Sequence, residues 1–315
     1  MKGKNIAMLL LGAAAMLALA GCGGNADKVA NPDGGIAYAN HESLSGVPQQ
    51  LHDGIQSLAA ADGIDFEDAT AEGNANVQLD QVNKMIDDKV AAIVLVAVNG
   101  DSIISAVTRA NEAGIPVIAT NRDVNGGIIT NVVNNERQAG ELQAEYMAAH
   151  LPQNGKVVYI TGDTSITAGV YRWEGFRDSL KSKRPDVEIL ANSGRGDWEF
   201  ANGLKNMTLW LELYPQIDGV AAGNDSMALG AVAAMKEAGR FNPDSVIVCG
   251  VDAIPDALKA IESGDMDMTV KQDVNKIIET IYSCIKQAKS GTMPQTGDIQ
   301  VPMTSLTKEN AAQYK

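Results

Sequence analysis

The feature that most constrains this chain is a repeated alternation of short, apolar, β-branched runs with longer segments of helical periodicity. This alternation is typical of a parallel sheet whose strands are connected by helices. The runs are continuously apolar, as in strands that are buried on both faces. We predict strands at residues 36–39, 92–98, 115–120, 156–161, 187–191, 219–222, 245–250 and 268–271. We predict helices at residues 77–88, 101–113, 137–151, 201–214, 226–238 and 274–290.

The same succession of helix, glycine and apolar strand occurs in both halves of the chain. Gly114 and Gly239 each follow a helical segment, at the position where a left-handed residue commonly ends a helix. About 290 of the 315 residues follow the N-terminal leader described below, which is enough for two lobes of ordinary size. We therefore predict an α/β protein with two similar lobes, each an open parallel sheet flanked by helices.

The N-terminus has the pattern of a secretory leader. Two lysines precede an apolar run of about 15 residues, which is shorter than the roughly 20 residues that span a bilayer as a helix. The run ends in Leu-Ala-Gly-Cys, a lipobox whose cysteine is Cys22. We expect residues 1–22 to be a lipoprotein signal peptide, Cys22 to carry a diacylglycerol, and residues 23–34 to form a flexible tether. The alternative is an ordinary cleaved signal with an incidental cysteine. With Cys22 acylated, the mature protein would be held at the membrane by its lipid alone.

Composition excludes some partners. The net charge of −14 removes the phosphate electrostatics on which nucleic-acid binding depends. Cys249 and Cys284 lie in apolar patterns and are expected to be buried free thiols. The acidic cluster at residues 65–68 indicates a solvated loop, and we assign no metal and no cofactor.

Polar residues directly follow several of the predicted strands. In open α/β sheets, ligands bind beyond the carboxyl ends of the strands. Any one such residue is more often a turn former or helix cap, and Asp225 is expected to be a cap. Their recurrence at four or more strand ends favours a binding site. Asn121, Arg122, Asn134, Asn224, Asp252 and Gln272 follow apolar runs, and Arg172 lies near the start of a helix.

Carboxylate, amide and guanidinium groups together suit a ligand rich in hydroxyls, which both donate and accept hydrogen bonds. Trp198 follows the predicted strand at 187–191, and its face could stack on the C–H face of a sugar ring. A lone tryptophan is otherwise a core residue.

Three phrases carry a resemblance to a known family: residues 224–231 (NDSMALGA), 250–258 (GVDAIPDAL) and 269–273 (TVKQD). With Asn121-Arg122 after the strand at 115–120, they resemble the periplasmic ribose- and galactose/glucose-binding proteins over essentially the whole mature chain. The resemblance implies a type I periplasmic binding protein fold with a three-segment hinge. It implies ligand contacts from Asn121, Arg122, Arg172, Asn224, Asp252 and Gln272, with Asn134 and Gln81 as weaker candidates. Trp198 falls at the position of a ring-stacking aromatic.

We expect one lobe to comprise residues 35–134 with 273–296 and the other 135–272 with 297–315. The crossings would then lie near Asn134, Gln272 and Gly297.

The chain also departs from both subfamilies. Asn121 matches the galactose binders, whereas Arg122 matches the ribose binders. Ile166 and Ala168 replace a carboxylate and a histidine of the galactose binders, and Val47-Pro48 stands where an aromatic pair is expected. Residues 151–155 are too short for the calcium loop of the galactose binders. The pocket is therefore a copy of neither.

Among function classes, catalysis is disfavoured, because neither a nucleophile elbow nor a phosphate-cradling loop is present. A sugar-responsive repressor would need an N-terminal helix-turn-helix where this chain has a lipobox. The sequence predicts a monomeric substrate-binding lipoprotein of an ABC transporter that delivers a monosaccharide-like ligand to the permease. It would sit on the outer face of the plasma membrane, or in the periplasm. A ligand-presenting sensor for a chemoreceptor or histidine kinase is the alternative, and a cyclitol, nucleoside or autoinducer remains an alternative ligand.

Overall fold

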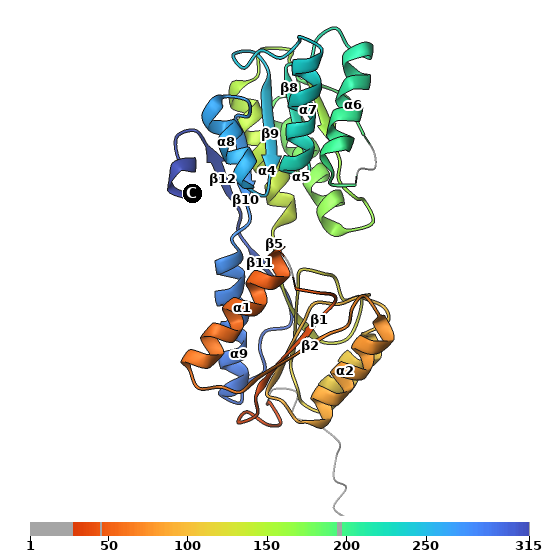
Figure 1. Ribbon diagram of the computed structural model, residues 1–315, viewed down its shortest axis with the longest axis vertical. Coiled ribbons are helices and arrows are strands. Elements are labelled where there is room, and N and C mark those ends of the chain that lie inside the picture. Colours follow the sequence, from red (N-terminus) through yellow and green to blue (C-terminus); the bar gives the residue numbers. More distant parts are fainter. Residues whose placement is uncertain (1–27, 45, 194–196, 315) are drawn as a thin grey trace, which may run out of the picture.

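The computed structural model describes residues 28–44, 46–193 and 197–314. The predicted signal peptide and the predicted lipidation site, Cys22, lie outside the described residues. Two lobes follow one another along the long axis of the molecule (Figure 1). In the described chain each lobe is built on one sheet of six strands. The predicted two-lobed α/β fold is thus confirmed.

The first sheet has the strand order β11-β5-β4-β3-β1-β2, and neighbouring strands run parallel. Its strands are β1 (Ile36–Asn40), β2 (Phe66–Thr70), β3 (Ala92–Leu95), β4 (Val117–Thr120), β5 (Ile129–Asn134) and β11 (Gly297–Val301). Its helices are α1 (Gly46–Ala61), α2 (Ala75–Asp87), α3 (Ile104–Glu112) and α9 (Val274–Lys289).

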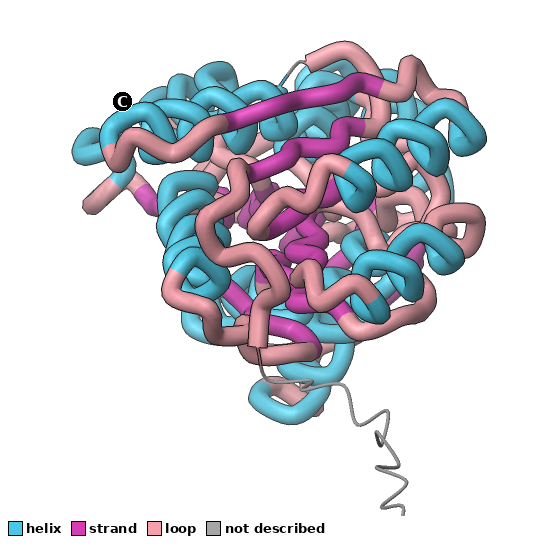
Figure 2. Tube along the Cα trace, turned by 90° about the horizontal axis from the view of Figure 1, so that it is seen from below, coloured by secondary structure: helices cyan, strands magenta, loops and turns pink. Residues whose placement is uncertain are grey.

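Side chains of β1 alternate between two cores because successive residues of a strand point to opposite faces. Ile36 and Tyr38 pack in the cluster that contains residues of α1 and α9. Ala37 and Ala39 pack in the cluster that contains residues of α2 and α3. Helices therefore cover both faces of the sheet, as Figure 2 shows from below.

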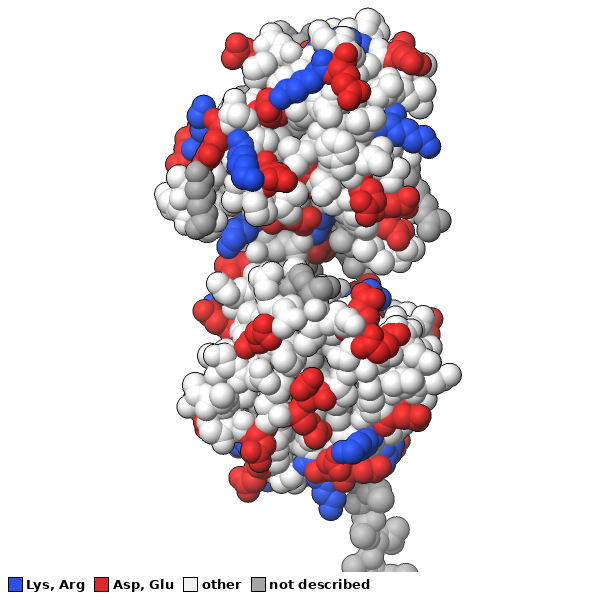
Figure 3. Space-filling view, viewed as in Figure 1, with Lys and Arg blue, Asp and Glu red and all other residues white. Residues whose placement is uncertain are grey.

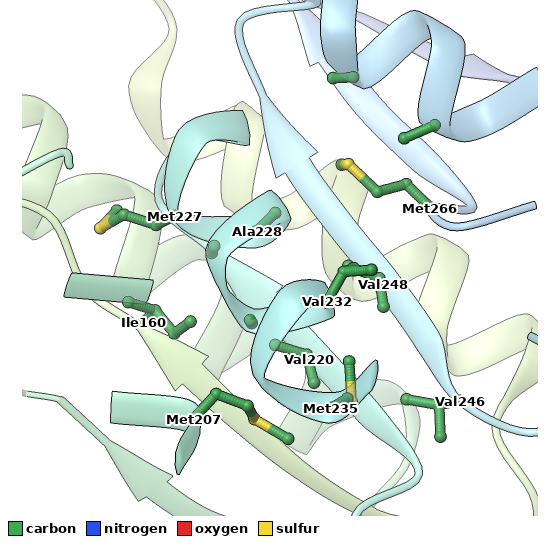
Figure 4. Packing of buried hydrophobic residues seen from close by; sticks show 14 of the residues in the cluster. Ile160, Met207, Val220, Met227, Ala228, Val232, Met235, Val246, Val248 and Met266 are labelled. Atoms are coloured by element: carbon green, nitrogen blue, oxygen red, sulfur yellow. The ribbon is translucent and has the colours of Figure 1, made fainter. Parts of the chain in front are cut away.

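The second sheet has the strand order β12-β10-β9-β8-β6-β7. Its strands are β6 (Lys156–Ile160), β7 (Glu188–Asn192), β8 (Gly219–Ala222), β9 (Ile247–Val251), β10 (Met268–Lys271) and the antiparallel β12 (Thr304–Thr307). Its helices are α4 (Glu136–His150), α5 (Thr167–Lys183), α6 (Phe200–Leu213), α7 (Asp225–Glu237), α8 (Pro255–Ser263) and the 3₁₀ helix η1 (Ala311–Tyr314). In one of its cores Val220 and Val248, from adjacent strands, lie beneath Val232 and Met235 of α7 (Figure 4).

Within the described residues the chain crosses between the lobes three times, after β5, after β10 and after β11. The third crossing lies between Val301 and Thr304, and our expectation of a crossing near Gly297 was wrong. Residues 297–301 belong to the first lobe because β11 pairs in parallel with β5. The side-chain amide of Asn131 also donates to Asp298 across this pair over 2.9 Å.

Two further expectations need correction. Of the cluster at residues 65–68, only Asp65 lies in an exposed loop, because Phe66–Thr70 forms the edge strand β2. Only Phe66 and Ala69 pack against the cores, so the apolar pattern of this strand is weak. The expected tether ends earlier than residue 34, since Val29 is buried and its N–H donates to the carbonyl of Gly291 over 3.1 Å.

Cys249 and Cys284 are buried free cysteines, as predicted. In the described part of the chain, no helix has the length and apolar character needed to cross a membrane.

Candidate ligand-binding site

A cleft of about 1010 Å³ lies between the lobes and is lined from both sides. Val47, Asn99 and Asn121 line it from the first lobe, and Tyr171 and Trp198 from the second. The space-filling view shows the molecule hollowed at this level, with charged side chains on both sides of the hollow (Figure 3). The carboxyl ends of the parallel strands face this cleft, as expected for open α/β sheets.

A chain of hydrogen bonds connects the hinge to the second lobe at the floor of the cleft. Asn134, at the end of β5, donates through its side-chain amide to Oε1 of Gln272 over 2.7 Å. Gln272, just after β10, donates to Oδ1 of Asp252 over 2.7 Å. Nη1 of Arg172 lies 3.6 Å from the same carboxylate oxygen. Three strand-end residues and one helical arginine thus form a single polar network.

Arg172 is the buried cation of this network, with only 4% of the residue exposed. Its Nε donates to Oε2 of Glu136 over 2.6 Å, and its Nη1 donates to the carbonyl of Gly223 over 2.7 Å. Burial lowers the pKa of Arg172, but Glu136 and Asp252 more than offset this and raise it above its ordinary value. The guanidinium is therefore charged at any physiological pH.

Asp252 completes the charge balance. Burial raises the pKa of its carboxyl, whereas Arg172 and Gln272 lower it, and the net shift is upward. Asp252 itself has a backbone φ of 113°, in the region that favours glycine. Two carboxylates, Glu136 and Asp252, thus surround one guanidinium.

Trp198 lies in a preformed position beside this network. The guanidinium carbon of Arg172 is 5.6 Å from the centre of the indole, within cation–π range. Gly162 leaves room for the ring, since a Cβ at that position would lie 2.1 Å from an indole carbon. Trp198 has a φ of 61°, and the amide of Asn224 donates to its carbonyl over 2.8 Å. The aromatic face is therefore held by backbone as well as by packing.

The structure separates the predicted residues into two groups. Those that line the cleft are Asn121, Arg122, Asn134, Arg172, Trp198 and Gln272. Asp252 is not among the described lining residues, but it accepts a hydrogen bond from Gln272 and forms an ion pair with Arg172. Asn224 instead caps α7, where its Oδ1 accepts from the N–H of Met227 over 3.0 Å. Gln81 lies on α2 and donates to the carbonyl of Thr70 over 2.9 Å, and it is not among the described residues that line the cleft.

Our expectation that Asp225 is a cap was therefore wrong, because Asn224 fills that position and Asp225 is the first residue of α7.

Arg122 contributes a more exposed charge to the first lobe. Its Nη2 lies 4.0 Å from Glu42, and 45% of its side chain is exposed. Asn121, which precedes it, has a φ of 63°, a conformation that asparagine adopts more readily than most residues. The chain turns at Asn121, directly after β4, and Asn121 and Arg122 both line the cleft there.

Sequence reasoning missed several residues of the cleft, among them Asn99 and Glu136. Asn99 follows the predicted strand at 92–98, so the strand-end rule applied to the other candidates would have found it. Glu136 lies at the start of α4, two residues after Asn134. Nothing in its local sequence indicates that it pairs with Arg172, which lies 36 residues further along the chain.

A family model described as a periplasmic binding protein domain matches residues 36–292. This chain belongs to that family. A xylitol-binding protein of Mycolicibacterium smegmatis is 31% identical over 93% of this chain and 83% of its own length. A putative rhizopine-binding protein of Rhizobium meliloti is 32% identical over 84% of this chain and 87% of its own length. The resemblance predicted from the sequence is thus confirmed at the level of the family.

Solved structures of ABC transporter binding proteins have a similar fold. An ABC transporter solute binding protein of Bacillus halodurans with bound myo-inositol has a TM-score of 0.72 and 31% identity, and the match covers 89% of this chain and 96% of that one. A periplasmic ribose ABC transporter protein of Conexibacter woesei has a TM-score of 0.81 at 20% identity, with 91% and 96% covered. The second likeness concerns the fold alone.

Proposed function

We propose that this protein is the substrate-binding component of an ABC importer and that it binds a neutral sugar or polyol in the cleft between its lobes. The observation that carries the proposal is the network from Asn134 through Gln272 and Asp252 to Arg172, beside the face of Trp198. Such a network offers donors and acceptors within reach of one aromatic face, the combination that a ring or chain of hydroxyls requires.

Relatives support the ligand class. The similar proteins named above are described as binding xylitol, rhizopine and myo-inositol, and others are named as import binding proteins for D-apiose and ribose. Because these relatives are named as import binding proteins, transport is favoured over the alternative of a ligand-presenting sensor. Val47 lines the first-lobe wall where the ribose and galactose binders are expected to carry an aromatic, so the first lobe presents an aliphatic side chain at that position. A polyol with one face on Trp198 fits that asymmetry.

The first experiment identifies the ligand. The domain, produced from residue 23, is screened by thermal shift against pentoses, hexoses, pentitols, inositols and nucleosides, because a ligand that binds only the folded form raises the melting temperature. We expect a pentitol, inositol or pentose to give the largest shift. No shift with any sugar or polyol would overturn the proposal.

A second experiment tests the site. Removing one partner of a buried, charged hydrogen bond costs about 1 to 3 kcal/mol, so Asp252→Ala and Arg172→Ala should each raise the Kd about tenfold or more. The matched control is Asp256→Ala, whose carboxylate is 73% exposed at the start of α8 and pairs only with exposed Lys259 in the described structure. Equal titration curves for Asp252→Ala and Asp256→Ala would remove Asp252 from the site.

We further propose that Cys22 is lipidated and holds a monomer at the outer face of the membrane. The lipobox before Cys22 supports this. Metabolic labelling with a radiolabelled fatty acid should mark the wild-type protein and not Cys22→Ser. Light scattering of the domain from residue 23 should give the mass of one chain, and the mass of a dimer would reject the monomer.

A further inference from the structure

The loop that presents Asp252 has an unfavourable backbone. Asp252 and Ala253 are consecutive non-glycine residues with φ values of 113° and 56°. L-residues rarely adopt this region, so such a pair persists only where the surroundings hold it. The strain lies at the residue whose carboxylate joins Gln272 to Arg172.

Each backbone N–H of this loop has a defined acceptor. Asp252 donates to the carbonyl of Val270 over 2.8 Å. Ala253 donates to Oγ1 of Thr269 over 3.2 Å, and Ile254 donates to Oδ2 of Asp225 over 3.0 Å. Two of the three acceptors are thus side chains of other elements.

The side chains of Thr269 and Asp225 are hydrogen-bonded to each other. The hydroxyl of Thr269, on β10, donates to Oδ1 of Asp225 over 2.6 Å, and neither residue is exposed. Because Asn224 caps α7, the carboxylate of Asp225 is turned toward the loop rather than toward its own helix. Gly250 makes room for it, since a Cβ there would lie 2.1 Å from Oδ1 of Asp225.

Burial raises the pKa of Asp225 to about 8. A buried carboxyl is costly unless its hydrogen bonds are used, and here both oxygens accept from the loop or from Thr269.

We propose that Asp225 and Thr269 are positioning residues for ligand binding: together they fix the backbone of residues 252–254 and so hold the carboxylate of Asp252 against Gln272 and Arg172, which line the cleft. The inference rests on the proposed function, because it takes the network of Gln272, Asp252 and Arg172 as the ligand-binding site. None of Asp225, Thr269 and Asp252 is among the described residues that line the cleft. The effect of Asp225 and Thr269 on the ligand therefore passes through Asp252 to Gln272 and Arg172, which do line it.

The test compares Thr269→Val with Thr269→Ser and with a control, Thr130→Val. Valine keeps the shape of threonine and removes the hydroxyl, whereas serine keeps the hydroxyl. Thr130 is buried on β5, and its hydroxyl donates to the carbonyl of Gln295 over 2.7 Å, far along the chain from the loop. Xylitol, myo-inositol and D-ribose are titrated calorimetrically into each folded variant.

We expect Thr269→Val to raise the Kd of the tightest of these probes about tenfold, as for the loss of one buried hydrogen bond. Thr269→Ser should stay within about threefold of wild type, and Thr130→Val should bind like wild type. Equal Kd values for Thr269→Val and Thr130→Val would overturn the inference. Failure of all three probes to bind wild type would instead count against the proposed function.

Amide hydrogen exchange of the ligand-free protein provides a readout that needs no ligand. Exchange at Ala253 and Ile254 should accelerate about tenfold or more in Thr269→Val and not in Thr130→Val. Should Thr269→Val fail to fold, Asp225→Asn takes its place, because asparagine keeps one acceptor oxygen and loses the other. Unchanged exchange at both amides overturns the inference whatever the titrations show.

Discussion

Nε of Arg172 lies 2.6 Å from a carboxylate oxygen of Glu136, and this contact joins α5 to the first residue of α4, where the chain enters the second lobe. The pair is mostly shielded from water, since 5% of the Arg172 side chain and 15% of the Glu136 side chain are exposed. It therefore fixes the guanidinium both to the cleft floor and to the hinge.

Glu136→Gln should destabilise the protein by ~3 kcal/mol, because it leaves a buried guanidinium without its closest carboxylate. It should also weaken ligand binding. Glu174→Gln is the control, since its pair with Arg137 is at 3.7 Å and partly exposed, and it should cost less than about 1 kcal/mol. Urea unfolding measures both, and equal losses would contradict the assigned role.

Asn224→Ala should separate capping from binding. It removes both the cap of α7 and the hydrogen bond to the Trp198 carbonyl, so we expect a stability loss of about 1 kcal/mol and a ligand affinity about fivefold lower. Asn74→Ala removes a comparable cap from α2, outside the described lining of the cleft. It should cost similar stability and leave the Kd unchanged; a change in Kd equal to that of Asn224→Ala would mean that capping alone explains the effect.

Stability should depend on pH through Asp225. The folded pKa, about 8, lies above the ordinary value of 3.8, so between these values the folded protein keeps a proton that the unfolded chain has released. Rising pH then favours unfolding, by up to about 1.4 kcal/mol per pH unit for this group. Burial also raises the pKa of Asp252, which acts in the same direction.

Asp225→Asn removes the contribution of Asp225 and leaves that of Asp252. The free energy of unfolding, measured in urea at pH 5, 6.5 and 8, should therefore fall less steeply with pH in the variant. Parallel curves for wild type and variant would show that Asp225 does not carry this proton.

Ligand should close the lobes. Asn121 and Arg122 line the cleft from the first lobe, and Arg172 and Trp198 line it from the second. A ligand that contacts both walls binds a closed form more tightly than an open one. Only such a difference in affinity can shift the equilibrium between the open and closed forms. The radius of gyration from solution scattering should fall slightly with saturating ligand. A polyol that gave no thermal shift is the control, and identical scattering with the true ligand would indicate a rigid pocket.

The sequence by itself determined that several strand-end residues lie at the cleft. Asn121, Asn134 and Gln272 were predictable because the carboxyl ends of parallel strands share one edge, so a local pattern is enough to bring them to the cleft. Separately, the alternation of strand and helix periodicity in both halves of the chain predicted the two α/β lobes.

Only the tertiary structure decided which partner each polar group takes. Glu136 pairs with Arg172, Asn224 turns to Trp198, and Asp225 reaches Thr269 across 44 residues. The edge strand β11 likewise joined the first sheet, not the second. These contacts depend on strand order, register and the orientation of one lobe's helices, which are set by packing between distant segments and leave no trace in the periodicity of any one of them.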